Sequence, residues 1–293
     1  MGIIENLKNH VKILSQDIGS RSIKEPEKLE AAGLYIESAL ESAGLNVLRQ
    51  EYEAEGALTA NLVARTPGWT GDAPVMVLGA HFDTVRGTPG ADDNASAVAV
   101  LIETARMIAE TAPEKSGNLL FVAFSTEEPP CFSTDCMGSR VFTERMAGSE
   151  AQLRGALVLE MVGYFSDEPG SQVIPQGLEL LGLPDTGNFI ALAADQQSAE
   201  LAEWVQVGIE RSGSGLPSIK LVDTGELPEL SRLMRLSDNA SFWDAGIPAI
   251  MITDTAFLRN PNYHEATDTA DTLDFEPMAK LLKALVHALA QDI

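Results

Sequence analysis

The chain contains 293 residues, of which 45% are apolar, so it is long enough to bury one sizeable hydrophobic core. Its formal net charge of −23 and its pI near 4.4 argue against nucleic acids and anionic membranes as partners, because both bind to basic faces. The charge alone identifies no partner. A well-solvated acidic surface explains it, and adaptation to high salt or attraction of cationic substrates are the alternatives.

The N-terminal residues lack the basic region and the continuous apolar stretch of a signal peptide. No apolar span of about 18 residues occurs, so no membrane-spanning helix is predicted. We therefore expect a cytoplasmic protein, unless a leader was removed before this numbering begins. In a reducing cytosol the two cysteines, Cys131 and Cys136, are predicted to be free thiols, with a short disulfide or an extra metal site as the alternatives.

Hydrophobic periodicity predicts helices and strands that alternate along the chain, the pattern of an α/β fold. Apolar residues recur at helical spacing from Ile4 to Ile18, and a second helix is expected from Pro26 until Gly44 stops it. The next expected elements are two edge strands at 47–52 and 61–65, a turn-rich connection at 66–74, a buried strand at 75–80, a helix at 97–108 and an apolar run at 118–124.

The second half of the chain shows the same alternation, interrupted by two irregular segments. Residues 164–188 are rich in glycine and proline and are interpreted as an excursion over the site, and residues 225–237 as a second cap. We expect one domain over 1–293 that includes both caps. The other expected elements are strands at 156–159, 189–193, 219–222 and 247–252 and helices at 139–146, 199–209, 241–245 and 276–290.

Chemistry-bearing residues follow the predicted strands at the point where each strand ends. His81 and Asp83 come after the strand at 75–80, where open α/β sheets place their sites. Asp92 and Asp93 come just before a predicted helix, so two carboxylates meet a helix N-terminus and need a counter-charge. Imidazole and carboxylate ligands suit zinc and similar cations, so this pattern predicts a metal cluster.

Three later segments supply the rest of that cluster. Glu127 and Glu128 follow the apolar run at 118–124, Glu160 ends the run at 156–159, and His264 lies in a loop. Because neighbouring residues in an extended segment point to opposite sides, one glutamate can bind a metal while the other handles a proton. Two histidines and three carboxylates are the number of ligands expected for a pair of cations bridged by one carboxylate and one water.

Six stretches around these residues form a set in a characteristic order. They are Gly79-Ala80-His81-Phe82-Asp83-Thr84-Val85, Pro89-Gly90-Ala91-Asp92-Asp93-Asn94-Ala95-Ser96, Glu127-Glu128, Ser237-Asp238-Asn239, Gly246-Ile247-Pro248-Ala249 and Tyr263-His264. With this set the chain resembles the di-zinc aminopeptidases of bacterial leucyl-aminopeptidase type, a group that also includes glutaminyl cyclases and glutamate carboxypeptidases. The resemblance implies a three-layer α/β/α fold with a mixed, mostly parallel sheet and helices on both faces.

Carried across residue by residue, the resemblance implies a site for two zinc ions with one shared ligand. The implied ligands are His81 and Glu160 for one ion and Glu128 and His264 for the other, with Asp93 as the bridge. The family commonly has aspartate where this chain has Glu160. The extra methylene group therefore bears on ligand geometry and on metal preference.

The same resemblance assigns roles to residues beside the ligands. Glu127 would be the general base that takes a proton from the bridging water, and Asp83 would orient His81. Tyr263 is a candidate for holding the oxyanion. Asp238 precedes a predicted helix, so it is interpreted equally as a helix N-terminal carboxylate and as a residue that supports the site from behind or contacts substrate.

Other residues near and outside the motifs carry weaker expectations. The Asp93-Asn94 peptide bond would be cis, as the resemblance implies. Asp268 and Asp271 are interpreted either as acids behind the ligands or as parts of a solvated turn. His10 is expected on the surface of the first helix.

Together these patterns predict a zinc-dependent exopeptidase, an aminopeptidase that acts on a peptide or aminoacyl substrate. A carboxypeptidase needs a cation, usually arginine, for the terminal carboxylate of its substrate. The segments expected around the cleft contain only Arg259, at a margin, although Arg232 and Arg235 in the second cap are an objection. The alternatives are a single-zinc enzyme similar to glutaminyl cyclase, a carboxypeptidase or acyl-amino-acid hydrolase, and a binding domain without catalysis.

Overall fold

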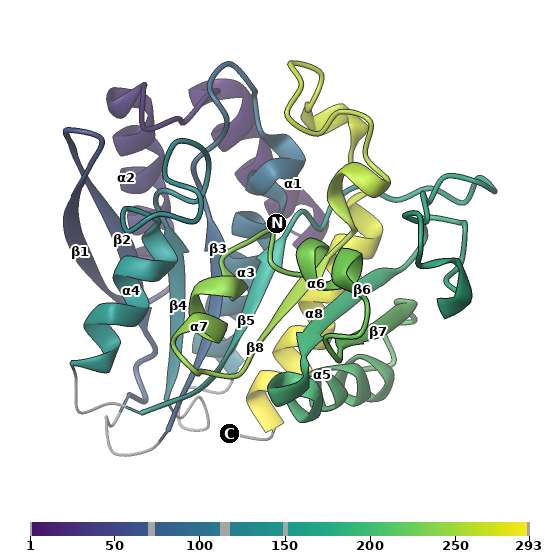
Figure 1. The fold of residues 1–293 in the computed structure, drawn as a ribbon. Coiled ribbons are helices and arrows are strands. Elements are labelled where there is room, and N and C mark those ends of the chain that lie inside the picture. The colour runs from purple at the N-terminus through teal and green to yellow at the C-terminus, as the bar shows by residue number, and fades with distance from the viewer. Residues whose placement is uncertain (1, 70–73, 112–117, 149–151, 292–293) are drawn as a thin grey trace.

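Eight strands form one mixed sheet in the computed structural model, in the order β1-β2-β4-β3-β5-β8-β6-β7 (Figure 1). The structure describes residues 2–69, 74–111, 118–148 and 152–291. Four of the seven neighbouring pairs, β3–β4, β3–β5, β5–β8 and β6–β7, are parallel, which confirms a mixed, mostly parallel sheet. The strands are β1 (Asn46–Ala54), β2 (Ala57–Arg65), β3 (Val75–His81), β4 (Leu119–Phe124), β5 (Leu153–Glu160), β6 (Ile190–Asp195), β7 (Ser218–Asp223) and β8 (Ala249–Thr253).

Helices cover both faces of this sheet, which confirms the predicted three-layer α/β/α fold (Figure 1). One face packs against α1 (Ile3–Lys12), the π-helical turns that continue it (Ile13–Ile18), α2 (Pro26–Ser42), α3 (Ala97–Thr111), α5 (Ala199–Arg211) and α8 (Phe275–Gln291). The other face carries α4 (Gly138–Ala147), α6 (Pro228–Leu233) and α7 (Asn239–Asp244). Among the described residues, no helix has the length and apolar character that crossing a bilayer requires.

The central strands are mainly apolar because helices cover both of their faces. In β3, Leu78 packs into the core under α3, whereas its neighbour Val77 packs into the core on the α4 side. The carboxyl ends of β3, β4, β5 and β8 open at one edge of the sheet. The next strand in the chain, β4, lies on one side of β3, and the following strand, β5, lies on the other side, so this edge is a topological switch point, where α/β sheets bind ligands.

The N-terminal strands differ from their prediction. β1 and β2 form a hairpin that turns at Glu55 and Gly56, both of which have positive φ values, 52° and 77°. β2 also pairs with β4, so the prediction that 61–65 is an edge strand was wrong. Its second partner lies more than fifty residues later, and local periodicity carries no information about such pairing. The connection predicted at 66–74 includes 70–73, which lie outside the described residues.

The prediction that the two cysteines are free thiols was also wrong. Cys131 and Cys136 form a disulfide, with their Cα atoms 5.3 Å apart. The backbone N–H of Thr134 donates to the carbonyl of Cys131 at 3.0 Å, so a turn folds the loop back on itself and brings the two sulfurs together. The alternative of a short disulfide is therefore the observed one.

His10 is packed between helices and is not the surface residue that periodicity predicts. Its side chain is 12% exposed, with Nδ1 2.7 Å from the Tyr35 hydroxyl and Nε2 3.4 Å from Glu103 Oε1. Glu103 is buried in α3 and also accepts hydrogen bonds from Asn6 and Arg106. This polar cluster joins α1 to α2 and α3.

We expect the charge of Glu103 to stabilise the fold in a pH-dependent way. Burial alone would raise its pKa, but hydrogen bonds from His10 and Arg106 lower the pKa to about 2. Because its pKa is lower in the folded state than in the unfolded state, ionised Glu103 stabilises the fold at pH values above the unfolded pKa of about 4.3. This stabilisation is lost as the pH falls through the folded-state pKa of about 2. Glu103→Gln should therefore reduce the free energy of unfolding at pH 7 by on the order of 3 kcal/mol.

Urea unfolding of wild type and Glu103→Gln across this pH range measures the effect. The difference between the two proteins should shrink as the pH falls from about 4.5 to about 2. A difference that stays constant over this range would show that the lost packing, and not the charge, explains the change in stability.

Candidate metal centre

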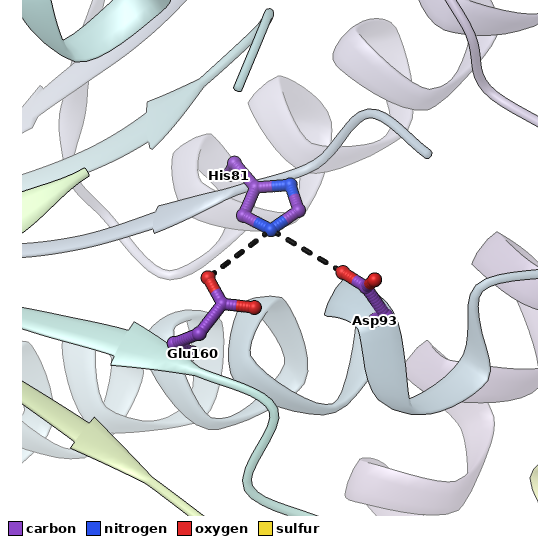
Figure 2. A group of neighbouring side chains, drawn as sticks. All are labelled: His81, Asp93 and Glu160. Carbon is purple, nitrogen blue, oxygen red and sulfur yellow. Dashed lines mark ion pairs between the residues drawn. The ribbon is translucent and has the colours of Figure 1, made fainter. Parts of the chain in front are cut away.

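The structure brings His81, Asp93 and Glu160 together at the switch-point edge of the sheet (Figure 2). His81 Nε2 lies 3.4 Å from Asp93 Oδ1 and 3.3 Å from Glu160 Oε2. These side chains come from the ends of β3 and β5 and from the turn before α3. All three are buried, so the parallel strand ends deliver one imidazole and two carboxylates to a single point.

A second group, Asp93, Glu128 and His264, lies beside the first. His264 Nε2 is 3.1 Å from Asp93 Oδ2 and 3.4 Å from Glu128 Oε2. Each oxygen of Asp93 therefore belongs to a different group. Because the imidazole of His264 is 32% exposed, this second group lies nearer to solvent than the first.

Both groups fit divalent cations. The buried atoms His81 Nε2, Asp93 Oδ1 and Glu128 Oε1 have no hydrogen-bond partner, although buried polar atoms are normally paired. Each group offers one imidazole nitrogen and carboxylate oxygens, a donor set that suits zinc. Orphaned atoms that point toward one another are the arrangement that bound cations would satisfy.

The electrostatics of the two groups point the same way. Burial would lower the pKa of His81, but Glu160 and Asp83 raise it well above the usual value. Burial would likewise lower the pKa of His264, which Asp93 and Glu128 raise to about 10. The pKa of Glu128 rises to about 8, first through burial and then through the charge of Asp93. The two ligand groups therefore carry an excess of buried negative charge, which favours the binding of a cation between their side chains.

Glu127 belongs to neither group, although it lies in the same cleft. Its Oε2 atom is 4.0 Å from His81 Nε2. Burial raises the pKa of this carboxyl well above its usual value; His81 opposes the rise, and neighbours such as Glu128 add to it. A buried carboxylate with a raised pKa that belongs to neither ligand group is a candidate to accept and return a proton.

Asp83 supports both halves of the site from behind. One of its oxygens lies 3.2 Å from His81 Nδ1 and accepts from the backbone N–H of Glu127 at 3.0 Å. The other accepts from the backbone N–H of Glu128 at 3.1 Å. The carboxylate of Asp83 thus fixes the imidazole orientation and ties the end of β4 to the end of β3.

We expect Asp83→Asn to weaken metal binding about 10- to 100-fold, the usual effect of removing a carboxylate behind an imidazole ligand. An amide offers one oxygen for the three groups that Asp83 now holds. Competition with a chromogenic chelator measures the zinc affinity. Asp17→Asn changes an exposed aspartate that pairs with Lys12, and it should leave the affinity unchanged. Equal affinities for the two variants would contradict the assigned role.

Several residues outside the ligand groups support the ligands through backbone hydrogen bonds. Asp268 accepts from the backbone N–H groups of Asp92 and Asp93, at 2.9 and 3.1 Å, so of its two interpretations the supporting one holds. Asn94 donates to the Leu159 carbonyl and accepts from the Met161 N–H, which fixes the end of β5. The Asp93-Asn94 peptide bond is cis, as the resemblance implied.

Arg21 is the least expected of these residues, because it lies sixty residues before the first motif. It is fully buried and donates to the carbonyls of Phe82 at 2.8 Å and Gly90 at 2.9 Å, on both sides of the loop between His81 and Asp93. It also donates to the carbonyls of Leu14, Gly19 and Pro89. Gly90 has a φ of 63°, and a Cβ there would lie 2.8 Å from the guanidinium, so glycine is required.

Asp238 and Tyr263 flank the two groups. Asp238 precedes α7 but makes no capping hydrogen bond; it is fully buried, its oxygens have no partner, and burial raises its pKa to about 7. Its neighbour Ser237 donates to Glu160 Oε2 at 2.6 Å. The ring of Tyr263 stacks on His264 with centroids 3.7 Å apart and lines the cleft. Asp271 lies at an exposed turn, away from these contacts.

An apolar cavity adjoins the metal cleft. Glu160, Leu236 and Tyr263 line both spaces, so the cavity opens directly beside the first metal group. Most of its remaining wall comes from the two predicted caps and from the sheet. That wall includes Ile174, Leu178, Leu230, Met234 and Met251.

Comparison with known proteins agrees with this geometry. Residues 61–289 match the sequence profile of peptidase family M28. The chain is 35% identical to the uncharacterized protein YfbL of Escherichia coli, over 97% of this chain and 87% of that protein. It is 26% identical to a probable leucine aminopeptidase of Trichophyton verrucosum, over 98% of this chain and 72% of that one.

Among solved structures, a zinc aminopeptidase from Bacillus subtilis shares the fold with a TM-score of 0.73 at 14% identity. The match covers 97% of this chain and 94% of that structure. Both the sequence profile and the fold thus extend over the strands that carry the two metal groups. The chain belongs to peptidase family M28.

Proposed function

We propose that this protein is an aminopeptidase that binds two zinc ions. The observation that carries the proposal is the position of Asp93, whose two oxygens face two separate groups of ligands. His81 and Glu160 would hold one ion, and Glu128 and His264 the other. When bound, two such ions would acidify a water between them and polarise the scissile carbonyl of the substrate.

Glu127 performs the proton transfers in this proposal. Its carboxylate lies in the cleft, outside both ligand groups, and burial raises its pKa. It takes a proton from the attacking water and returns it to the nitrogen of the leaving peptide, so one residue acts first as base and then as acid. Tyr263 lines the same cleft, where its hydroxyl is a candidate donor to the oxygen of the tetrahedral intermediate.

The charge of the cleft favours a substrate with a free N-terminus. No lysine or arginine is among the described residues that line the cleft or the apolar cavity. Arg259 is buried, where it donates to Gln172 and to the Phe189 carbonyl. Arg232 pairs with Glu229, and Arg235 pairs with Asp244. These three arginines thus contact other residues of the protein and do not line the cleft. The acidic cleft suits the ammonium group of a free N-terminus.

The apolar cavity indicates the first residue of the substrate. Because it adjoins Glu160 and is walled by aliphatic side chains, it would receive a large apolar side chain next to the scissile bond. A probable leucine aminopeptidase among the relatives is consistent with this preference. We therefore expect hydrolysis of leucyl and phenylalanyl substrates to exceed that of glycyl and glutamyl substrates.

The runner-up functions make different demands on the site. A glutaminyl-cyclase-like enzyme would use one zinc ion, whereas two groups of three candidate donors, which share Asp93, support a site for two ions. A carboxypeptidase would need a cation in the cleft, and a binding domain that has lost catalysis would be expected to lack ligands. Here all five ligand positions are filled by histidine, aspartate or glutamate.

Two assays test the proposal together. Metal analysis after zinc reconstitution and desalting should find two equivalents per chain, whereas saturation at one equivalent would favour the cyclase-like reading. A panel of aminoacyl anilides, measured with and without zinc, should show zinc-dependent release of the anilide with leucine among the best substrates. Absence of turnover across the panel with both metals bound would contradict the aminopeptidase assignment.

A further inference from the structure

The loop of residues 129–137, called the clip loop here, directly follows Glu128 and contains both cysteines of the sequence. The Cys131–Cys136 disulfide closes it. Cys131 is fully buried, Phe132 is half-buried, and residues 133–135 are exposed. The proposed proton transfers and metal ligands give this loop no task.

Both ends of the clip loop are attached to the segment that carries the general base. At its start, the backbone N–H of Cys131 donates to the Glu128 carbonyl at 3.0 Å. At its end, the Thr126 hydroxyl donates to the Cys136 carbonyl at 2.6 Å. Because Thr126 and Glu128 flank Glu127, the disulfide joins two points that are each held to the end of β4. The clip loop is therefore fixed relative to the reacting groups.

The residues that line the metal cleft show which part of it the clip loop forms. Five of the nine described lining residues are the proposed base and metal ligands. The other four are Pro129, Phe132, Leu236 and Tyr263. Leu236 and Tyr263 also line the apolar cavity, whereas Pro129 and Phe132 line the cleft alone. The clip loop therefore forms the part of the cleft wall that is not shared with the cavity.

We propose that the clip loop is the wall on the leaving-peptide side of the cleft, that Phe132 selects an apolar second residue in the substrate, and that the disulfide holds Phe132 in place. The inference rests on the proposed function. If the first side chain occupies the apolar cavity and the scissile carbonyl lies between the metal groups, the rest of the peptide must leave through the remaining part of the cleft. Phe132 is the one large apolar side chain there among the described residues.

The disulfide restrains this wall locally and should stabilise the whole fold less than a disulfide that closes a long loop. The stabilisation that a disulfide provides grows with the length of the loop it closes, and this loop is short, with a separation of five residues. Removing it should therefore affect the position of Phe132 more than global unfolding. If removing the disulfide changes the selectivity for the second residue of the substrate, the disulfide positions Phe132 and does not only stabilise the fold.

Dipeptides that differ in one position test the proposal. For the zinc-loaded enzyme, the ratio of kcat/KM for Leu-Phe over Leu-Gly reports the second residue, and the ratio for Leu-Gly over Ala-Gly reports the first. Phe132→Ala should lower the second-residue ratio roughly tenfold and leave the first-residue ratio unchanged. Phe132→Leu, which keeps an apolar side chain, should retain most of the second-residue preference.

Two further variants complete the design. Phe257→Ala is the matched control, because Phe257 lines the apolar cavity and not the metal cleft; it should change the first-residue ratio and spare the second. The double variant Cys131→Ala/Cys136→Ala should lower the second-residue ratio while it keeps two zinc ions and loses no more than a few degrees in thermal midpoint.

The outcomes separate this inference from the function on which it rests. Turnover of both leucyl dipeptides by Phe132→Ala with an unchanged second-residue ratio would overturn the role of the clip loop and leave the aminopeptidase assignment standing. A normal ratio in the double cysteine variant would overturn the role of the disulfide. Failure of the wild-type enzyme to cleave any dipeptide would overturn the proposed function and the inference with it.

Discussion

Glu127→Gln is expected to retain two zinc ions and to lose about 10²- to 10⁴-fold in turnover, the usual range for removing a general acid–base group. The substitution keeps the size of the side chain, and Glu127 belongs to neither group of metal ligands, so metal binding should persist. The amide cannot accept the proton of the attacking water or return it to the leaving nitrogen. Metal analysis and kcat for a leucyl anilide are the two measurements.

A matched substitution of an exposed glutamate controls for the loss of one negative charge. Glu200 lies in the first turn of α5, outside the residues that line the cleft. Glu200→Gln should turn over substrate like the wild type. If Glu127→Gln kept both metals and near-wild-type turnover, the base would have to be another residue.

Arg21→Met is expected to reduce the free energy of unfolding by about 3 to 5 kcal/mol, because it leaves several buried carbonyl groups without a donor. Burial lowers the pKa of Arg21 to about 10, and acids such as Asp268 raise it, so the guanidinium is charged at neutral pH. Methionine fills part of the space but donates no hydrogen bond. The midpoint of urea unfolding should fall with an unchanged slope.

The exposed Arg211, at the end of α5, provides the control. Arg211→Met should shift stability by no more than about 0.5 kcal/mol, as surface substitutions usually do. Equal midpoints for Arg21→Met and the wild type would refute the account in which the guanidinium supports the loop between His81 and Asp93.

Three of the candidate ligands were predictable from local patterns in the sequence. His81 and Glu160 end buried parallel strands, and Glu128 closely follows another, so an apolar run in the sequence marks each position. Parallel strands share one edge for their carboxyl ends, which brings residues far apart in the sequence to one place. The ligand roles remain predictions; the structure shows that the side chains converge.

Residues that support the ligands were harder to predict, because their partners are distant in the sequence. Arg21 donates to carbonyls near residue 90, and Asp268 accepts from N–H groups at Asp92 and Asp93. Such contacts involve backbone atoms, which every residue has, so no residue type marks the partner. The position of β2 inside the sheet escaped prediction because its second partner is also distant in the sequence. The free-thiol prediction was wrong for another reason: it rested on an assumed reducing compartment and not on the way the loop folds.

The most direct test of the proposed function follows one short peptide, with an apolar first residue, in three forms: free, N-acetylated and C-amidated. Each form is incubated with zinc-loaded enzyme, and mass spectrometry records which end is shortened. The account predicts that residues leave the N-terminus of the free and amidated peptides, because the cleft receives a free ammonium group, and that the acetylated peptide is spared. Shortening of the acetylated peptide from its C-terminus would contradict it.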